Sequence, residues 1–425
     1  MATFDFLDNA DLRGIIDAQL DHCFSYTRHS IKCSEFEDRD LIYSGFSRLA
    51  QSYRSGRHFL QNEEELNDNK IALNTFFDAL RSSRRKKVME DVSKAHLKLM
   101  NRLIQKFDVD YLREFPYLDG YRVFAADGHY IEKPTHSQKS RKDRSYASGS
   151  IYSMDMRTGL MDFLCNVTNG SRKSHEVPPF EEYLKENSRE KIPTVWILDR
   201  AYIDGLLWTT QSRNKQYLIC RIKKNMALKK IGELEYESDL KINDGVNDYY
   251  LGAIDCHGAA VAVVDYEDPE TAEQYTFYTT LPITKDLTPG LIAWLYRLRW
   301  DIEKSYDTYK NALFNQKAWA TTKNAQCIQA QLTVMFHNLM RYLSEKLKSE
   351  GYSDRKVEQK RALNLKKRED IAQKKGRTLP RLLYLKNRMT QISLQFVRTF
   401  QNWFLTAKPY RIVKNILIQR LEAYI

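Results

Sequence analysis

The stretch TVWILD, residues 194–199, decides the fold class of this 425-residue chain. Its β-forming apolar residues run directly into Asp199, as in a short buried strand that ends in an acid. The stretch YRVFAAD, residues 121–127, repeats the pattern and ends in Asp127. We therefore predict two strands of one sheet, each with an aspartate at its carboxyl end, where α/β sheets hold functional groups.

The residues around these two stretches alternate between strand and helix patterns. Residues 148–167 predict a hairpin, with the turn DMRTG between its two strands. Helical spacing follows at 176–187 and 203–213, and another strand pattern covers 216–222. A hairpin followed by alternating strands and helices predicts an α/β sheet of mixed direction.

Both ends of the chain favour helices, whereas residues 225–288 favour strands. Apolar residues fall at helical spacing up to about residue 115, and again over 289–312 and 325–348. The first helical region holds the basic run RRKK at 84–87, which suits recognition of a DNA end or merely a solvated helix end. Strand patterns within 225–288 predict a β-rich insertion.

Positive charge is concentrated near the carboxyl terminus. The chain holds 67 Lys and Arg against 55 Asp and Glu, a net charge of +12. Residues 355–388 alone hold thirteen of these cations against three acids, which is close to the whole excess. Such a concentration favours contact with nucleic acid, with a solvated segment as the alternative.

Cysteine usage and hydropathy indicate the compartment. The six cysteines are widely spaced and form no CxxC pair, as expected for reduced thiols of a cytoplasmic protein. The acidic start MATFDFLDNADL does not resemble a signal peptide, and no apolar run is long enough to cross a membrane. We expect a soluble cytoplasmic protein without a membrane partner.

The stretch YRLRWDIEKSYDTYK, residues 296–310, places unlike side chains on one face of a helix. Treated as one continuous helix, Tyr296, Arg299, Glu303 and Lys310 lie within about 60° of one another, with Trp300 just beside them. An acid between cations and aromatic rings suits neither a core face nor a solvated face. It suits chemistry on a charged polymer.

Phosphoryl transfer on DNA explains this combination. Asp127, Asp199 and Glu303 would supply the hard oxygen ligands that Mg²⁺ prefers, and paired metals activate and stabilise the reacting oxygens. Neighbouring cations would contact phosphates, and Tyr or Trp would stack on an unpaired base. Taken singly, each aspartate could merely end a strand in a turn, and Glu303 with Lys310 could be surface charges. Their joint pattern favours a site.

The same stretches resemble a known enzyme family. The run at 296–310 fits Y-x2-R-x3-E-x6-K, the signature of DDE transposases of the insertion-sequence-four family. ILDRAYIDG, residues 197–205, and FAADGHYIE, residues 124–132, resemble that family's second and first aspartate motifs. The resemblance covers about 120–345. It implies a ribonuclease-H-like catalytic core, Mg²⁺ or Mn²⁺ as cofactor, terminal inverted repeats and target DNA as partners, and a homodimer on paired ends.

The resemblance also implies roles for single residues. Asp127, Asp199 and Glu303 would be the catalytic metal ligands. The expected DNA contacts are Tyr296, Arg299 and Lys310, to which we add Trp300, Arg200, Lys223 and Lys224, with solvated surface as the alternative for the last two. His129, His136 and the pair His175-Glu176 could approach the carboxylates, or merely form hydrogen bonds near them.

The division of the chain follows from these patterns. We expect a helical DNA-end-binding domain at 1–115, a catalytic core split into 116–224 and 289–348, a β-rich insertion at 225–288, and a basic helical region for DNA binding or dimerisation at 349–425. Some relatives hold a flipped base with a Trp of the insertion, but residues 225–288 contain no Trp. Which aromatic side chain would do so here therefore stays open.

Three activities fit the sequence. The first is cut-and-paste transposition, in which the enzyme cleaves DNA ends and joins the freed 3′-hydroxyls to a target. The second is hydrolysis by a nuclease of the same fold that does not join strands. The third is DNA binding by a catalytically silent relative, which the presence of all three carboxylates disfavours. We expect the protein to associate with chromosomal DNA.

Overall fold

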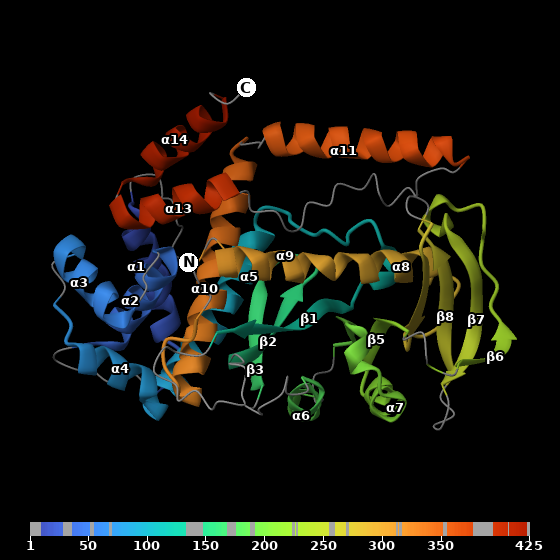
Figure 1. Ribbon diagram of the computed structural model, residues 1–425, viewed down its shortest axis with the longest axis horizontal. Coiled ribbons are helices and arrows are strands. Elements are labelled where there is room, and N and C mark those ends of the chain that lie inside the picture. Colours follow the sequence, from blue (N-terminus) through green and yellow to red (C-terminus); the bar gives the residue numbers. More distant parts are fainter. Residues whose placement is uncertain are drawn as a thin grey trace, which may run out of the picture.

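The fold is built around one mixed β-sheet with helices on both faces, shown by the computed structural model in Figure 1. The structure describes residues 10–28, 36–51, 55–67, 70–132, 148–167, 176–187, 192–222, 226, 228–254, 260–268, 272–311, 313, 317–351, 355–376, 394–406 and 408–422. No helix of this described part is long and apolar enough to cross a membrane.

The first five strands form one half of the sheet. They are β1 (Arg122–Ile131), β2 (Ser148–Asp155), β3 (Met161–Val167), β4 (Thr194–Leu198) and β5 (Gln216–Arg221), in the order β3-β2-β1-β4-β5. The pairs β1–β2 and β2–β3 are antiparallel, whereas β4 runs parallel to β1 and β5 parallel to β4. This order and these directions confirm the expected ribonuclease-H-like mixed sheet.

The β-rich insertion continues this sheet. Its strands are β6 (Leu228–Glu233), β7 (Val246–Ile254), β8 (Ala260–Glu267) and β9 (Gln274–Thr279). They pair antiparallel, and β9 also pairs with β5, so that the order continues β5-β9-β8-β7-β6. The insertion is therefore hydrogen-bonded to the first five strands and is not a detached unit.

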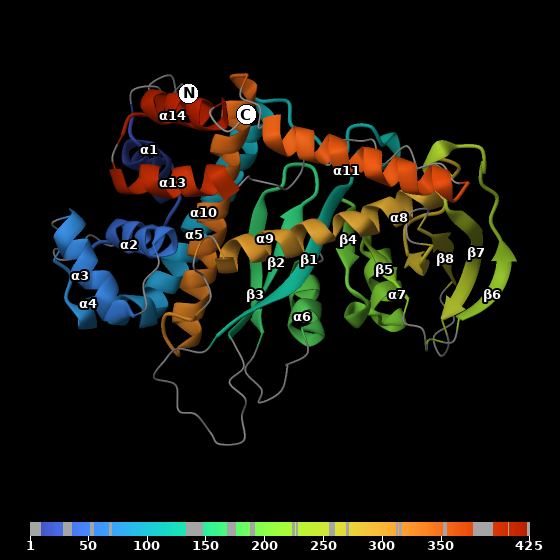
Figure 2. The same ribbon diagram turned by 45° about the horizontal axis from the view of Figure 1, so that its top comes forward.

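The two faces of the sheet bury different helices. Alternate residues of β1 and β4, such as Ala125 and Ile197, face a large core that includes α5 (Ser83–Gln105), α8 (Pro289–Leu298), α9 (Trp300–Asn311) and α10 (Lys323–Ser349). The intervening residues, such as Trp196, face α6 (Val177–Asn187) and α7 (Gly205–Arg213). Burial on both faces explains why β4 is a continuous apolar run. Figure 2 shows α6 and α7 on the side away from α8 and α9.

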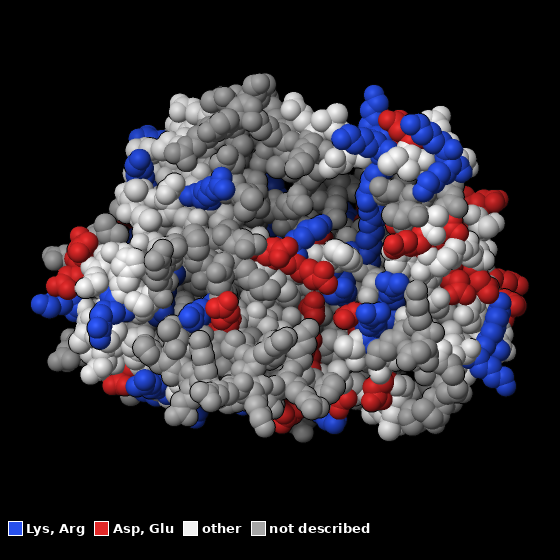
Figure 3. All heavy atoms as spheres, in the orientation of Figure 1, with Lys and Arg blue, Asp and Glu red and all other residues white. Residues whose placement is uncertain are grey.

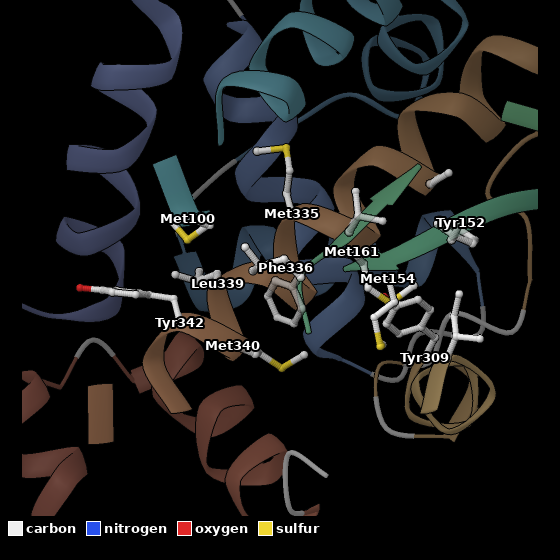
Figure 4. Close-up of a cluster of buried hydrophobic side chains, with 14 of the residues drawn as sticks. Met100, Tyr152, Met154, Met161, Tyr309, Met335, Phe336, Leu339, Met340 and Tyr342 are labelled. Carbon is white, nitrogen blue, oxygen red and sulfur yellow. The ribbon is translucent and has the colours of Figure 1, made fainter. Parts of the chain in front are cut away.

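Helices from both ends of the chain share the larger core. It takes in α1 (Leu12–Phe24), α2 (Asp38–Ala50), α3 (Gly56–Asn67), α4 (Leu73–Arg81), α13 (Leu394–Thr406) and α14 (Tyr410–Glu422). At its centre, Met335, Phe336 and Met340 of α10 lie near Met100 of α5 and Met161 of β3 (Figure 4). The helical N-terminal region thus packs against the later helices and the sheet.

α10 also covers the free edge of the sheet. The side-chain oxygen of Asn338 accepts a hydrogen bond from the backbone N–H of Met161, and its amide nitrogen donates to the Met161 carbonyl, both at 2.8 Å. Met161 begins β3, the edge strand of the order above. This pair of bonds satisfies backbone groups that another chain could otherwise pair with.

The basic run at 84–87 is mostly occupied within the protein. Arg84 donates to both carboxylate oxygens of the buried Asp38, at 2.7 and 2.8 Å. Arg85 is itself buried and donates to the carbonyl of Phe36, and Lys86 pairs with Glu90 at 3.1 Å. Arg84 and Arg85 therefore fasten α5 to its neighbours, and Lys86 pairs within α5, which weakens the expectation that this run contacts DNA. Local sequence could not show Asp38 and Phe36 as partners, because they come from another segment.

The basic region near the carboxyl terminus is helical where the structure describes it. α11 (Arg355–Lys374) lies on the same side of the molecule as α8 and α9 in both ribbon views (Figures 1 and 2). The cations Lys366, Lys367 and Lys374 of α11, and Lys375 just after it, are exposed. Blue spheres gather at the end of the helix that carries these lysines in Figure 3. The rest of the predicted basic stretch, 377–388, lies outside the described residues.

Candidate active site

The register of the sheet brings the two predicted aspartates together. β1 and β4 pair in parallel from Arg122↔Thr194 to Ala125↔Ile197. Continued by two residues, this register places Asp127 level with Asp199. Side chains alternate along a strand, so both aspartates point to the face of Ala125 and Ile197, which α8 and α9 cover.

β1 continues beyond Asp127, which corrects one expectation. The sequence predicted a strand that ends at the acid, but β1 runs to Ile131. The reason is its other neighbour, because β1 stays paired with β2 from Gly128↔Ile151 to Ile131↔Ser148. β4 does end at Leu198, as expected. Asp127 therefore lies beside a notch in the sheet, where β1 continues and β4 has stopped.

Each aspartate is oriented by the residue that follows it. The Oδ1 atom of Asp127 accepts a hydrogen bond from the N–H of Gly128 at 2.9 Å. The Oδ1 atom of Asp199 accepts one from the N–H of Arg200 at 2.7 Å, where Asp199 caps the short helix Arg200–Tyr202. The Oδ2 atom of Asp127 faces Arg299.

The predicted helical stripe is interrupted at Arg299. α8 ends at Leu298 and α9 begins at Trp300, so the assumption of one continuous helix was wrong. The N–H of Arg299 donates to the carbonyl of Tyr296, and the N–H of Ile302 donates to the carbonyl of Arg299, both at 3.1 Å. These three-residue turns tighten the chain locally, although α8 and α9 still follow one another along one line (Figure 1).

Arg299 joins the acids of the site. Its Nη1 atom lies 3.3 Å from Oδ2 of Asp127, and its Nη2 atom lies 2.8 Å from Oε1 of Glu303. Burial lowers the pKa of Arg299, but Tyr296, Asp127, Glu303 and Asp199 raise it, and the net direction is upward. Asp127 and Glu303 therefore share one arginine, which is only 6% exposed, and Asp199 lies near enough to affect its pKa.

The charged form of Asp127 is disfavoured in this arrangement. Its pKa is raised to about 7, first because burial penalises the charged form and then because Glu176 and Glu303 lie near. The Arg299 guanidinium and the N–H of Gly128 oppose this rise. One cation thus compensates the carboxylates only in part, and a further positive charge here would be favourable.

An aromatic layer supports Asp127 from α9. The hydroxyl of Tyr306 donates a hydrogen bond to the carbonyl of Asp127 at 2.7 Å. The Tyr306 ring stacks on His129, with 4.7 Å between centroids, and both side chains are buried. The sequence did not single out Tyr306, although its position one turn after Glu303 could have placed it beside the site. His129 lies under the site as part of this layer.

The catalytic region also matches a family of known proteins. Residues 118–339, just over half of the chain, match the family described as Transposase DDE domain. The chain belongs to the Transposase DDE domain family. The matched part of this DDE domain contains Asp127, Asp199 and Glu303, and it runs from just before β1 into α10.

A solved structure and the curated proteins give further comparisons. The structure is described as the cryo-EM structure of a piggyBac transposase synaptic complex with hairpin DNA. It is 13% identical in sequence, covers 89% of this chain and 82% of that chain, and superposes with a TM-score of 0.43. No curated protein sequence matches the chain.

The other predicted site residues of the DDE domain lie in different surroundings. Tyr296 is buried, with its ring 5.0 Å from that of Phe277 and 5.6 Å from the Arg299 guanidinium. Trp300 is 58% exposed at the start of α9, and Arg200 is exposed just after Asp199. Lys310 belongs to α9, but its side chain lies outside the described residues, as do Lys223, Lys224, His136 and His175.

The donor chemistry of the DDE domain suits a divalent cation. Carboxylate oxygens are the hard ligands that Mg²⁺ and Mn²⁺ take, and a cationic group already lies between Asp127 and Glu303. As placed, no three His, Cys, Asp or Glu side chains of the described residues lie together closely enough to hold a metal ion. For Asp127 and Glu303 to share an ion, Arg299 has to move from between them.

Proposed function

We propose that this protein is a DNA transposase of the cut-and-paste type, related to the insertion-sequence-four family. It would bind the terminal inverted repeats of a transposon, cleave the DNA at each end, and join the freed 3′-hydroxyls to target DNA. One observation carries the proposal. The parallel register of β1 and β4, continued by two residues, brings Asp127 level with Asp199, which directly follows β4, and Arg299 lies between Asp127 and Glu303 of α9.

The three carboxylates would hold Mg²⁺ or Mn²⁺. When bound, such ions activate the attacking oxygen and stabilise the leaving oxygen of the phosphodiester. The chain's own groups prepare this site. The N–H groups of Gly128 and Arg200 orient the aspartates, and Tyr306 fixes the backbone at Asp127. Preorientation of this kind lowers the cost of reaching the reactive geometry.

Arg299 would change partners when DNA and metal are bound. Its guanidinium is planar and suited to bidentate contact with a phosphate, and it lies between two of the carboxylates. Released from Asp127, it would contact the phosphate next to the cleavage site. The exposed ring of Trp300 follows directly in the chain and would stack on a base that leaves the duplex.

Further cations would bind the DNA backbone. We assign this role to four residues. Arg200 follows the second aspartate, Lys310 lies in the last turn of α9, and Lys223 and Lys224 lie where the insertion begins. The exposed lysines of α11 add positive charge on the side of α8 and α9 (Figure 3). Pairing of two ends in a homodimer, and a DNA-end-binding role for the N-terminal helices, complete the proposal.

Strand transfer separates this proposal from a plain nuclease. The substrate is an oligonucleotide that carries the inverted repeat from the gene's own locus with a free 3′-hydroxyl, mixed with plasmid target and Mg²⁺. We expect joined products from the wild type and none from Asp199→Asn. Hydrolysis without joining would favour a nuclease. End binding without either reaction would favour a catalytically silent relative.

A further inference from the structure

Glu176 reaches the site from the face opposite to α9. It lies directly before α6, and its carboxylate rests on the Cα atom of Gly128, the residue that follows Asp127. A Cβ atom at position 128 would lie 2.3 Å from both Cδ and Oε1 of Glu176. Only glycine leaves room for this approach, so the close contact depends on the residue next to the first aspartate.

Two tyrosines hold the Glu176 carboxylate in place. The hydroxyl of Tyr202 donates to Oε2 of Glu176 at 2.9 Å, and Tyr130 is also hydrogen-bonded to this carboxylate. Tyr202 is buried in the turn after Asp199, and Tyr130 lies on β1 three residues after Asp127. Both aspartate segments therefore contribute a donor to the same acid.

These donors orient the negative charge of Glu176 without cancelling it. Tyrosine hydroxyls are neutral, and within the described residues no Lys or Arg forms an ion pair with Glu176. If Glu176 were only a structural acceptor, a neutral side chain would serve the two hydroxyls equally well. A glutamate placed there adds a negative charge beside the proposed catalytic acids. A bound cation would offset the cost of burying this charge.

The notch in the sheet brings that charge to Asp127. Because β4 ends at Leu198 while β1 continues, the side of β1 at Asp127 is open to both faces of the sheet. Because the Glu176 carboxylate rests against the Cα atom of Gly128, a second negative charge lies beside the residue that follows Asp127.

We propose that Glu176 is a fourth carboxylate of the catalytic centre, a positioning residue whose charge strengthens the binding of a divalent cation at Asp127. The inference rests on the proposed function, because it assumes that Asp127 and Asp199 hold such an ion. The affinity of oxygen-ligand sites rises with the number of carboxylate charges that surround the ion. Gly128, Tyr130 and Tyr202 serve to place this fourth charge.

The test is a Mn²⁺ titration of the full-length, DNA-free protein, followed through the electron paramagnetic resonance signal of free Mn²⁺. Glu176→Gln keeps the size and an acceptor for Tyr202 and removes only the charge. We expect its Mn²⁺ dissociation constant to rise about 10-fold or more, with partial recovery in Glu176→Asp. Glu181→Gln, which removes an acid from α6, the helix that follows Glu176, should bind as the wild type does.

A second readout is the metal dependence of cleavage. Glu176→Gln should need more Mn²⁺ for half-maximal cleavage and recover towards the wild-type rate at saturating Mn²⁺. A variant that is folded, as judged by its melting temperature, and binds Mn²⁺ like the wild type would overturn the inference and leave Glu176 as a structural acceptor.

Asp199→Asn separates this failure from failure of the proposed function. If Asp199→Asn loses Mn²⁺ binding while Glu176→Gln keeps it, the three-carboxylate centre stands and only the role of Glu176 is refuted. If the wild type itself binds no Mn²⁺ at a site sensitive to Asp199→Asn, both proposals are refuted.

Discussion

At the residue scale, Arg299 decides the state of the site without metal. It is buried and compensates Asp127 and Glu303 at once. A divalent cation would take over this compensation with two charges in place of one. Arg299 and a bound metal ion would thus be alternative partners of the same oxygens.

Removal of Arg299 should make stability depend on metal. We expect Arg299→Gln to lower the free energy of unfolding by about 3 kcal/mol in the absence of metal, because it leaves partly buried carboxylates unpaired. If Mn²⁺ binds the carboxylates of the folded state, as we propose, it should raise the melting temperature of this variant more than that of the wild type. Differential scanning fluorimetry with and without Mn²⁺ measures both effects. Equal shifts in the two proteins would show that Arg299 and the metal do not share the carboxylates.

Trp300 should matter for DNA and not for folding. Its ring is exposed, so Trp300→Ala should change the free energy of unfolding by no more than about 0.5 kcal/mol. Loss of stacking on an unpaired base costs about 1–3 kcal/mol, which corresponds to roughly a 5- to 150-fold weaker interaction. The measurement is binding to end DNA with an unpaired terminal base, with Leu206→Ala, an exposed residue of α7, as control. Unchanged binding by Trp300→Ala would assign the stacking to another side chain.

At the element scale, α8 links the insertion to the site. Gly290 lies in the first turn of α8, and its N–H donates to Oδ1 of Asn243 at 2.9 Å. A Cβ atom at position 290 would lie 1.8 Å from the carbonyl oxygen of Ile242. The insertion therefore packs closely against the start of α8, the helix that precedes Arg299 and Glu303. A displacement of α8 at Gly290 would shift these two residues.

Gly290→Ala should accordingly harm both stability and activity. We expect a loss of about 1–3 kcal/mol from overpacking, because the obstacle is backbone and cannot rotate away. Gly232→Ala is the matched control, since its nearest neighbour would be Leu251 at 3.9 Å. Chemical denaturation of both variants gives the comparison, and an equal stability of the two would mean that η4 (Lys241–Asn243) yields without cost.

Helices and strands could be predicted where the local spacing of apolar residues determines them. The apolar run of β4, the hairpin of β2 and β3, and α10 were expected from sequence periodicity alone. The continuation of β1 past Asp127 was not, because it depends on pairing with β2 across a separate segment. The interruption of the helix at Arg299 could not be predicted, because no Pro or Gly lies there. The contact of Arg299 with Asp127 could not be predicted either, because the two residues lie 172 positions apart.

At the scale of the whole molecule, long-range pairing limits what charge patterns reveal. The run at 84–87 suggested DNA contact, but Arg84 and Arg85 bind Asp38. By contrast, Asp127, Asp199 and Glu303 could be predicted as a set, because two aspartates after apolar strands and a glutamate on a late helix form a pattern that single residues lack. Their role as metal ligands stays a prediction. Glu176 was only a candidate, because its approach depends on the fold around Gly128.

The central claim is that three carboxylates act as one metal-dependent centre on transposon ends. Its most direct test is cleavage of a plasmid that carries the inverted repeats from the gene's own locus, with Mg²⁺ or Mn²⁺, by the wild type and by Asp127→Asn, Asp199→Asn and Glu303→Gln. Asp307→Asn, an exposed acid one turn further along α9, is the control. We predict cuts at the repeat ends by wild type and Asp307→Asn, and none by the other three variants, which should still bind the ends. Cleavage that survives in any of these three would contradict the account.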